Sequence, residues 1–239
     1  MRVCTSYALL LLASVLTACG VSPHAVIEPR PTVDVRRTRP PAPSDELTCI
    51  ADPRIDTWER RLRAPRGVGD TMRHDVMRGE EYLPSLRPLV VQAGLPTSLA
   101  LLPAIESGFD AHARGRAGEY GLWQLRPATA RRFGLVVTRK RDDRVAPDRA
   151  TRAAARYLRQ LYGHYQDWPL ALAAYNAGEG RVDRALARHP RGSFWDLARA
   201  GLLPRHSRDY VPRFLALVRI HEGAAGCPPE ALQASRGVE

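Results

Sequence analysis

The chain has 239 residues, of which 44% are hydrophobic and 26% are charged. This composition excludes a disordered chain and a fibrous repeat, and it predicts one globular domain with tails. The net charge of +11 comes almost wholly from arginine, since Lys140 is the only lysine. The cysteines at positions 4, 19, 49 and 227 form no CxxC motif and no cluster with histidine. We therefore expect neither a metal site nor a cofactor.

The first 18 residues read as an export signal. Arg2 precedes an almost entirely apolar run over residues 7–16, which is too short for a transmembrane helix of about 20 apolar residues. Two small residues then lead into Cys19, and this pattern resembles the signal of bacterial lipoproteins, in which the cysteine is lipidated. We predict a lipid anchor on Cys19, and Gly20 rather than aspartate after it favours the periplasmic face of the outer membrane. The alternative is an ordinary signal peptide that contains a cysteine.

Residues 19–48 are predicted to be a lipid-anchored linker that is disordered and rich in proline and arginine, with six prolines between residues 21 and 48. Cys49 and Cys227 lie just inside the two ends of the predicted domain, 49–228. In an oxidising compartment a disulfide between them would join these ends, and two free thiols are the alternative. Residues 229–239 read as a C-terminal tail.

From residue 49 onward the hydrophobic pattern is helical, with little strand-like alternation, which predicts an all-α domain. The clearest helix begins at Pro147, has apolar side chains every three or four residues up to Leu161, and is expected to end near Gly163. Further helices are expected at 58–63, 72–94 with breaks near its prolines, 96–109, 168–177 and 208–222.

One carboxylate falls on an apolar helix face. Glu106 follows Leu102 by four residues and Leu99 by seven, so on a continuous helix the three side chains share one face. Loss of hydration on such a face raises the pKa of a carboxyl group toward neutrality, as a general acid requires. The structural alternative is a buried glutamate that is paired with an arginine.

Three further motifs follow Glu106 in order. They are GLWQ at 121–124, AYNAGEGRV at 174–182 and YVP at 210–212. The side chains of Gln124 and Asn176 can form hydrogen bonds to amides and hydroxyls, and Tyr175 and Tyr210 each offer an apolar face and a phenol. These properties suit sugar binding. For the aromatic residues, packing in the core is the alternative.

Together with E-S-x-F at 106–109, the ordered motifs resemble the soluble-lytic-transglycosylase (SLT) family, and within it the membrane-bound type D. The likeness spans residues 58–220. It implies a goose-lysozyme-like α-helical fold and cleavage of the β-1,4 bond from MurNAc to GlcNAc in peptidoglycan, with formation of 1,6-anhydroMurNAc ends. It also implies that Glu106 is the catalytic acid and then the base, and that the substrate cleft contains Ser107, Gln124, Tyr175, Asn176 and Tyr210.

The resemblance implies that no second carboxylate is needed, because the C6 hydroxyl of the same sugar acts as the nucleophile in place of water. The sequence departs from the family pattern at Gly115, where a serine is usual, at Glu119, where a small residue is usual, and at His206-Ser207, where Glu-Thr is usual. Glu119 is either solvated, paired with Arg114, Arg116 or Arg126, or an auxiliary group that helps to activate water.

The sequence therefore predicts a peptidoglycan lytic transglycosylase for cell-wall remodelling. A muramidase-type hydrolase of the same bond and a non-catalytic peptidoglycan-binding lipoprotein are the alternatives. The expected partners are the glycan strands, the membrane through Cys19, and cell-wall machinery proteins. Nucleic acid is not expected as a partner, because the arginines are scattered and an export signal is present.

Overall fold

The computed structural model describes residues 47–223. The predicted signal peptide, Cys19, the linker up to residue 46, Cys227 and the tail lie outside this range, and the predicted domain boundaries stay predictions. Cys49 is disulfide-bonded. Because its expected partner Cys227 is not described, the pairing itself also stays a prediction. Among the described helices, none combines the length and apolar character that crossing a bilayer requires.

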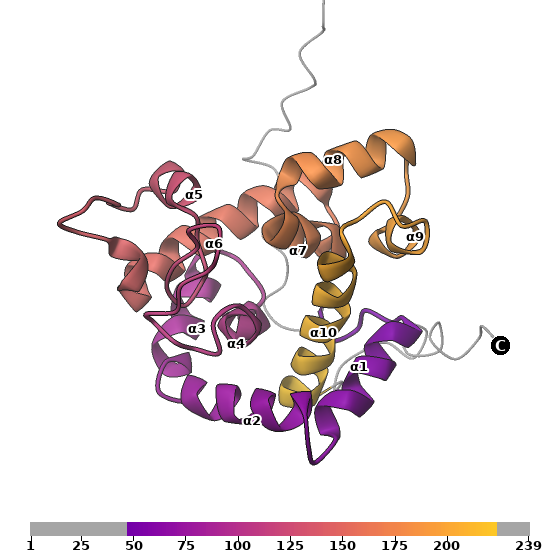
Figure 1. The fold of residues 1–239 in the computed structure, drawn as a ribbon, viewed down its shortest axis with the longest axis horizontal. Coiled ribbons are helices and arrows are strands. Elements are labelled where there is room, and N and C mark those ends of the chain that lie inside the picture. The colour runs from indigo at the N-terminus through magenta and orange to yellow at the C-terminus, as the bar shows by residue number, and fades with distance from the viewer. Residues whose placement is uncertain (1–46, 224–239) are drawn as a thin grey trace, which may run out of the picture. The chain divides into compact units, whose positions relative to one another are not determined.

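The described part is built of α-helices joined by turns and loops (Figure 1). Between residues 47 and 223 the only β-type pairings are isolated bridges, of which two join residues 114, 120 and 125. In chain order the helical elements are α1 (Pro53–Arg63), α2 (Val68–Gly79), α3 (Leu83–Gln92), the 3₁₀ segment η1 (Thr97–Leu101), α4 (Leu102–Glu106), α5 (Pro127–Arg132), the 3₁₀ segment η2 (Asp143–Val145), α6 (Pro147–Tyr165), α7 (Trp168–Ala177), α8 (Glu179–Arg188), α9 (Phe194–Arg199) and α10 (Arg205–Glu222).

Helix α7 lies at the centre of the core. Its residues from Trp168 to Ala174 are all buried, and it packs against α6, α8 and α10. A helix that is apolar all round must be surrounded by other elements, so α7 becomes the support on which its neighbours rest. Helix α10 packs in turn against α1, η1 and α4, and thereby connects the core to the short helix that ends at Glu106.

The predicted helix at Pro147 is confirmed as α6, but it ends at Tyr165 rather than at Gly163. Gly163 stays inside the last turn, and Gln166, with a φ of 51° in the left-handed region, ends the helix. The helix predicted at 58–63 begins earlier, at Pro53. There the side chain of Asp52 accepts a hydrogen bond of 2.9 Å from the backbone N–H of Arg54.

The prediction of one helix over 96–109 is wrong. The chain forms η1 and then α4, and α4 ends at Glu106. Pro103 has no N–H to donate, so a regular α-helical hydrogen-bond ladder cannot run through it, whereas the first turn of a new helix accepts it. Leu99 and Glu106 therefore do not share a continuous α-helix. Helices α5, α8 and α9 were not among the predicted elements.

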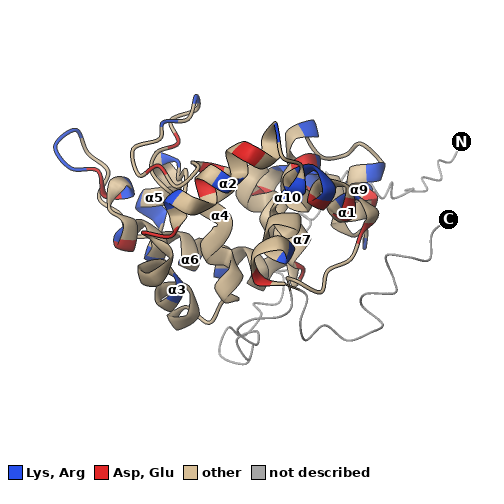
Figure 2. Cartoon of the chain, turned by 90° about the horizontal axis from the view of Figure 1, so that it is seen from below, with Lys and Arg blue, Asp and Glu red and all other residues tan. Residues whose placement is uncertain are grey.

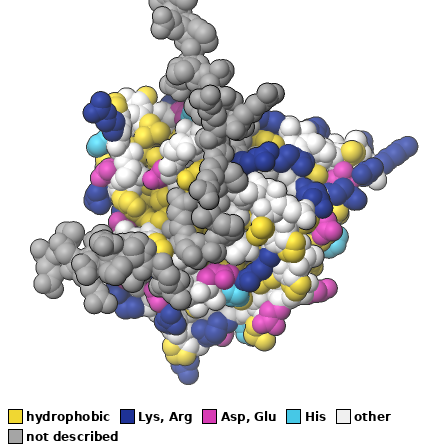
Figure 3. Space-filling view, turned by 180° about the vertical axis from the view of Figure 1, so that it is seen from behind, with side chains coloured by type: hydrophobic (Ala, Val, Ile, Leu, Met, Phe, Trp, Pro, Cys, Tyr) yellow, Lys and Arg dark blue, Asp and Glu magenta, His cyan; other side chains and the backbone are white. Residues whose placement is uncertain are grey.

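Charged side chains of both signs are interspersed on the face shown in Figure 3. A loop between α5 and η2 projects from the domain, and Figure 2 shows basic side chains along it. At its turn the Oγ1 of Thr138 accepts a hydrogen bond of 3.0 Å from the N–H of Arg141, and the N–H of Thr138 donates to the carbonyl of Arg141 at 2.8 Å. These bonds give the loop a tight turn.

Candidate active site

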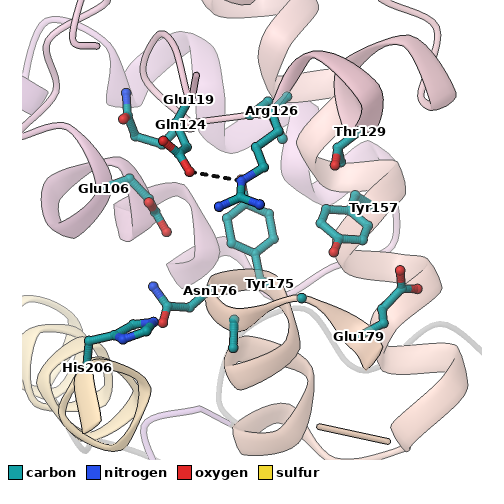
Figure 4. A pocket seen from close by; sticks show the side chains of 13 residues that line it. Glu106, Glu119, Gln124, Arg126, Thr129, Tyr157, Tyr175, Asn176, Glu179 and His206 are labelled. Carbon is teal, nitrogen blue, oxygen red and sulfur yellow. Dashed lines mark hydrogen bonds and ion pairs between the residues drawn. The ribbon is translucent and has the colours of Figure 1, made fainter. Parts of the chain in front are cut away.

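A cavity of about 470 Å³ opens between α4, the loop that precedes α5, and helices α6, α7 and α10 (Figure 4). Its lining is rich in carboxylate, amide and phenol groups, which are groups that bind sugars and move protons. The lining residues are Glu106, Glu119, Gln124, Leu125, Arg126, Thr129, Tyr157, Tyr175, Asn176, Ala177, Gly178, Glu179 and His206.

Glu106 is the last residue of α4 and faces this cavity. Burial raises its pKa from 4.5 to about 7, although a hydrogen bond from Tyr210 and the charge of Arg213 act in the opposite direction. The hydroxyl of the buried Tyr210 donates this hydrogen bond to Oε1 of Glu106. A carboxyl group with such a pKa can give up a proton near neutral pH and take it back.

Two side chains, those of Arg213 and Ser107, fix the end of α4, so that the Glu106 backbone is held in place. Nη2 of Arg213, on α10, donates to the carbonyl of Ile105 at 3.1 Å. The hydroxyl of Ser107 donates to the carbonyls of Leu122, at 2.9 Å, and of Pro103, at 3.3 Å. Ser107 and Tyr210 are not among the lining residues, and each acts on the site through its hydrogen bonds to Glu106 or to the backbone around it.

The two amide residues are oriented by bonds that use one end of each side chain. Nε2 of Gln124 donates to the carbonyls of Gly121, at 2.8 Å, and of Ala113, at 3.0 Å, and the residue has a φ of 45°. The Oδ1 of Asn176 accepts a hydrogen bond of 2.8 Å from the hydroxyl of the buried Ser207. Each side chain therefore has a fixed direction in a cavity that both residues line.

Tyr175 is held by its hydroxyl, which donates to the carbonyl of Trp123 at 2.8 Å. Its ring packs against that of Tyr157 with centroids 5.4 Å apart. Burial raises the pKa of both phenols, that of Tyr157 to about 12, so both stay protonated near neutral pH. The two rings form an aromatic part of the cavity wall.

The loop between α4 and α5 carries Glu119. Oε1 of Glu119 accepts a hydrogen bond of 2.9 Å from Nε of Arg126, and Oε2 accepts one of 2.9 Å from the backbone N–H of Ala117. The ion pair with Arg126 confirms one of the three pairings expected from the sequence. Burial raises the pKa of Glu119, but the hydrogen bonds to its carboxylate and the charge of Arg126 outweigh this effect and leave the pKa lowered.

Gly115 gives the Glu119 side chain its room. A Cβ atom at position 115 would lie 2.4 Å from Oε2 of Glu119 and 2.8 Å from its Cβ. Both distances are far below van der Waals contact, so the present position of Glu119 requires a glycine here. The two departures from the family pattern, at 115 and 119, are therefore a single packing arrangement.

Sequence reasoning missed several lining residues, among them Glu179, Thr129 and Tyr157. Glu179 lies within the AYNAGEGRV motif, directly after Gly178. A glycine in this motif indicates the end of a helix, and in the structure Gly178, with a φ of 90°, ends α7 and leads the chain into α8. Glu179 is paired with Arg132 at 3.4 Å. Thr129 and Tyr157 come from α5 and α6, and no motif marked them.

Of the predicted site residues, Glu106, Glu119, Gln124, Tyr175 and Asn176 line one cavity. Their predicted roles, and those of Ser107 and Tyr210, remain predictions. Among residues 47–223 no group of three or more histidine, cysteine, aspartate or glutamate side chains is placed to hold a metal ion.

Comparison with known proteins gives one family. Residues 91–197 match the family model of the transglycosylase SLT domain. The chain is 41% identical over 150 residues to membrane-bound lytic murein transglycosylase D of Escherichia coli K12, over 60% of this chain and 32% of that protein. It is 38% identical over 117 residues to peptidoglycan transglycosylase gp16 of Escherichia phage T7, over 48% of this chain and 8% of that protein.

A solved structure has a similar fold. The X-ray structure of an inactive variant of the lytic transglycosylase Slt from Pseudomonas aeruginosa matches with a TM-score of 0.52 and 28% identity, over 62% of this chain and 25% of that chain. The predicted all-α, lysozyme-like fold class is thereby confirmed. The chain spans about a third of the length of the type D relative.

Proposed function

We propose that this chain is a peptidoglycan lytic transglycosylase, because residues 91–197 match the family model of the transglycosylase SLT domain. The observation that carries the proposal is a single carboxyl group, Glu106, whose pKa burial raises to about 7 and which faces a cavity lined by amide and phenol groups. The names of the relatives support the substrate, because murein and peptidoglycan appear in them.

The proposed reaction needs one residue in two roles. Protonated Glu106 gives its proton to the glycosidic oxygen, and the bond from this oxygen to C1 of MurNAc breaks. Glu106 is then a carboxylate, and it takes the proton of the C6 hydroxyl of the same sugar as this hydroxyl oxygen bonds to C1. The products are a GlcNAc with a free hydroxyl and a 1,6-anhydroMurNAc end. An intramolecular nucleophile has a high effective concentration, so no positioned water is required.

The contacts around Glu106 suit both halves of this cycle. Tyr210 donates a hydrogen bond that favours the carboxylate, while burial favours the neutral acid. The resulting pKa of about 7 leaves both forms populated near neutral pH. Gln124 and Asn176 are proposed to bind the hydroxyl and N-acetyl groups of the sugars, since each lines the cavity with an amide whose direction is fixed.

Hydrolysis of the same bond is a second candidate function. It is favoured by the presence of Glu119 in the cavity, with a lowered pKa beside the raised pKa of Glu106, a difference typical of an acid and base pair. In this case Glu119 would take a proton from water. Both oxygens of Glu119 already accept hydrogen bonds, which makes its carboxylate a weak base. Anhydro formation is therefore the leading proposal.

We also propose that the chain is anchored to a membrane by a lipid on Cys19, at the periplasmic face of the outer membrane. The sequence pattern before Cys19 supports the anchor, and the membrane-bound relatives support membrane association. Cell-wall machinery proteins are also proposed as partners, and the only support for them is that the proposed substrate is peptidoglycan.

Mass spectrometry of sacculi digested by the purified protein tests the proposed function. We expect muropeptides lighter by one water than those from a muramidase, and their loss with Glu106→Gln. Glu106→Gln is expected to lower turnover by about 10²- to 10⁴-fold, which is the usual contribution of a general acid, while the helical circular dichroism spectrum is retained. Products with reducing ends would establish the hydrolase instead, and Glu119→Ala should then change the product ratio.

A further inference from the structure

Arg126 reaches into the same cavity as Glu106 with the outer edge of its guanidinium free. Its Nε donates to Glu119 at 2.9 Å, whereas neither of its Nη atoms forms a hydrogen bond to another residue within 47–223. The side chain is 57% exposed, so this edge is accessible to a ligand. Figure 4 shows the guanidinium directed into the space that Glu106 and Tyr175 also face.

Both ends of the Arg126 side chain are held in place. At the backbone, Arg126 precedes Pro127 with an extended conformation, and its carbonyl accepts a hydrogen bond of 2.8 Å from the N–H of Ala130. At the guanidinium, the bond to Glu119 fixes the direction of Nε, and Glu119 is itself fixed by the N–H of Ala117. An arginine held at both ends loses less entropy when it binds a ligand.

The charges around the cavity balance, so they do not repel an anion from this edge. The negative charge of Glu119 is offset by Arg126, and that of Glu179 by Arg132. Glu106 is neutral in the form that starts the proposed reaction. The planar fork of a guanidinium matches the two oxygens of a carboxylate and can bind both at once. The free edge of Arg126 therefore fits a carboxylate better than a neutral sugar hydroxyl.

We propose that Arg126, oriented by Glu119 in the space that Gly115 leaves open, binds a carboxylate of the substrate beside the bond that is cleaved. This inference rests on the proposed function, because it takes the substrate to be peptidoglycan. Two groups could supply the carboxylate: the stem peptide of an intact strand, or the lactyl group of a MurNAc from which the peptide has been removed.

Three substrates from one batch of sacculi test the proposal: native strands, strands whose carboxylates have been converted to amides, and strands stripped of stem peptides. We expect the full-length protein to show a half-saturation concentration about tenfold lower for native than for amidated strands, the loss typical of one partly exposed charge-assisted hydrogen bond. Arg126→Gln should remove this preference by raising the half-saturation concentration for native strands to that for amidated strands. Preference for stripped over amidated strands would identify the lactyl carboxylate, and its absence the stem peptide.

Two variants complete the test. Arg159→Gln removes the same charge from an exposed position on α6 outside the cavity lining, so it should keep the preference for carboxylates. Glu119→Gln should reduce the preference in part, because a neutral amide orients Arg126 less firmly. Equal half-saturation of the native protein for native and amidated strands would overturn the proposal, as would a preference that survives Arg126→Gln.

A separate binding measurement distinguishes failure of this inference from failure of the proposed function. Co-sedimentation of Glu106→Gln with the three kinds of strand measures binding without turnover. If the native protein cleaves no strand, the transglycosylase proposal fails, but weaker binding of the Glu106→Gln, Arg126→Gln double variant to native strands would still support the carboxylate site. Binding that is equal for the single and double variants would refute that site.

Discussion

Glu106 and Glu119 line one cavity side by side, Glu106 from the end of α4 and Glu119 from the loop that precedes α5, and these two parts of the wall act on their carboxyl groups in opposite directions. On the helical wall, burial dominates and raises the pKa of Glu106 to about 7. On the loop wall, backbone N–H groups and Arg126 surround Glu119 and leave its pKa lowered despite its burial. Glu106 can therefore hold a proton near neutral pH, whereas Glu119 keeps its negative charge.

The difference follows from the way each wall is built. Glu106 is the last residue of α4 and receives a hydrogen bond from a phenol of α10. The unpaired backbone groups at the C-terminal end of a helix are carbonyls, which cannot donate to a carboxylate. The loop around Glu119 has N–H groups that no regular helix uses, and one of them, from Ala117, donates to Glu119. Burial therefore outweighs hydrogen bonding at Glu106, whereas hydrogen bonds and the ion pair outweigh burial at Glu119.

The largest effect is expected on the pH dependence of stability. The folded-state pKa of Glu106, about 7, lies above the reference value of 4.5, so the proton on Glu106 stabilises the fold below pH 4.5 and this contribution is lost as pH rises through 7. Relative to Glu106→Gln, the native protein should lose up to about 3 kcal/mol across that window. Urea denaturation of both proteins at several pH values measures the difference. A constant difference across the window would contradict the raised pKa.

The second-largest effect concerns the packing of Gly115 against Glu119. Gly115→Ala should lower the free energy of unfolding by about 1–3 kcal/mol, as is usual when extra atoms are forced into a packed site. In the background of Glu119→Gly, which removes both the carboxylate and the Cβ that an alanine would meet, the same substitution should cost much less. A double-mutant cycle measured by thermal or urea denaturation gives the coupling. Additive effects would show that the two positions do not share space.

Tyr210→Phe removes the hydrogen bond to Glu106 while keeping the buried ring. We expect kcat to fall about tenfold, the effect of one hydrogen bond to a charged group. Because that bond favours the carboxylate, its loss should raise the pKa of Glu106 further and move the alkaline limb of the pH–rate profile to higher pH. A shift to lower pH would mean that Tyr210 acts on the neutral acid instead.

The helical wall was in part predictable from sequence, and the loop wall was not. The spacing of apolar residues after Pro147 indicated α6 directly, because such periodicity marks the buried face of a helix. The prediction of one helix over 96–109 was wrong because Pro103 has no N–H to donate, and the segment divides into η1 and α4. The fit between Gly115 and Glu119, and the free edge of Arg126, depend on how a loop folds back on itself, and no periodic pattern encodes that.

The smallest effect tests whether the charge of Glu119 changes the pKa of Glu106. The charge of Glu119 raises the pKa of Glu106, as the weakest of its causes, so Glu119→Gln should move the alkaline limb of the pH–rate profile to lower pH by a fraction of a unit. Glu179→Gln is the matched control, since Glu179 also lines the cavity and pairs with an arginine but is not among the causes that shift Glu106. Its alkaline limb should stay in place. Equal shifts in both variants would indicate a general effect of the charge in the cavity. A shift with Glu119→Gln alone would show that the charge of Glu119 itself raises the pKa of Glu106.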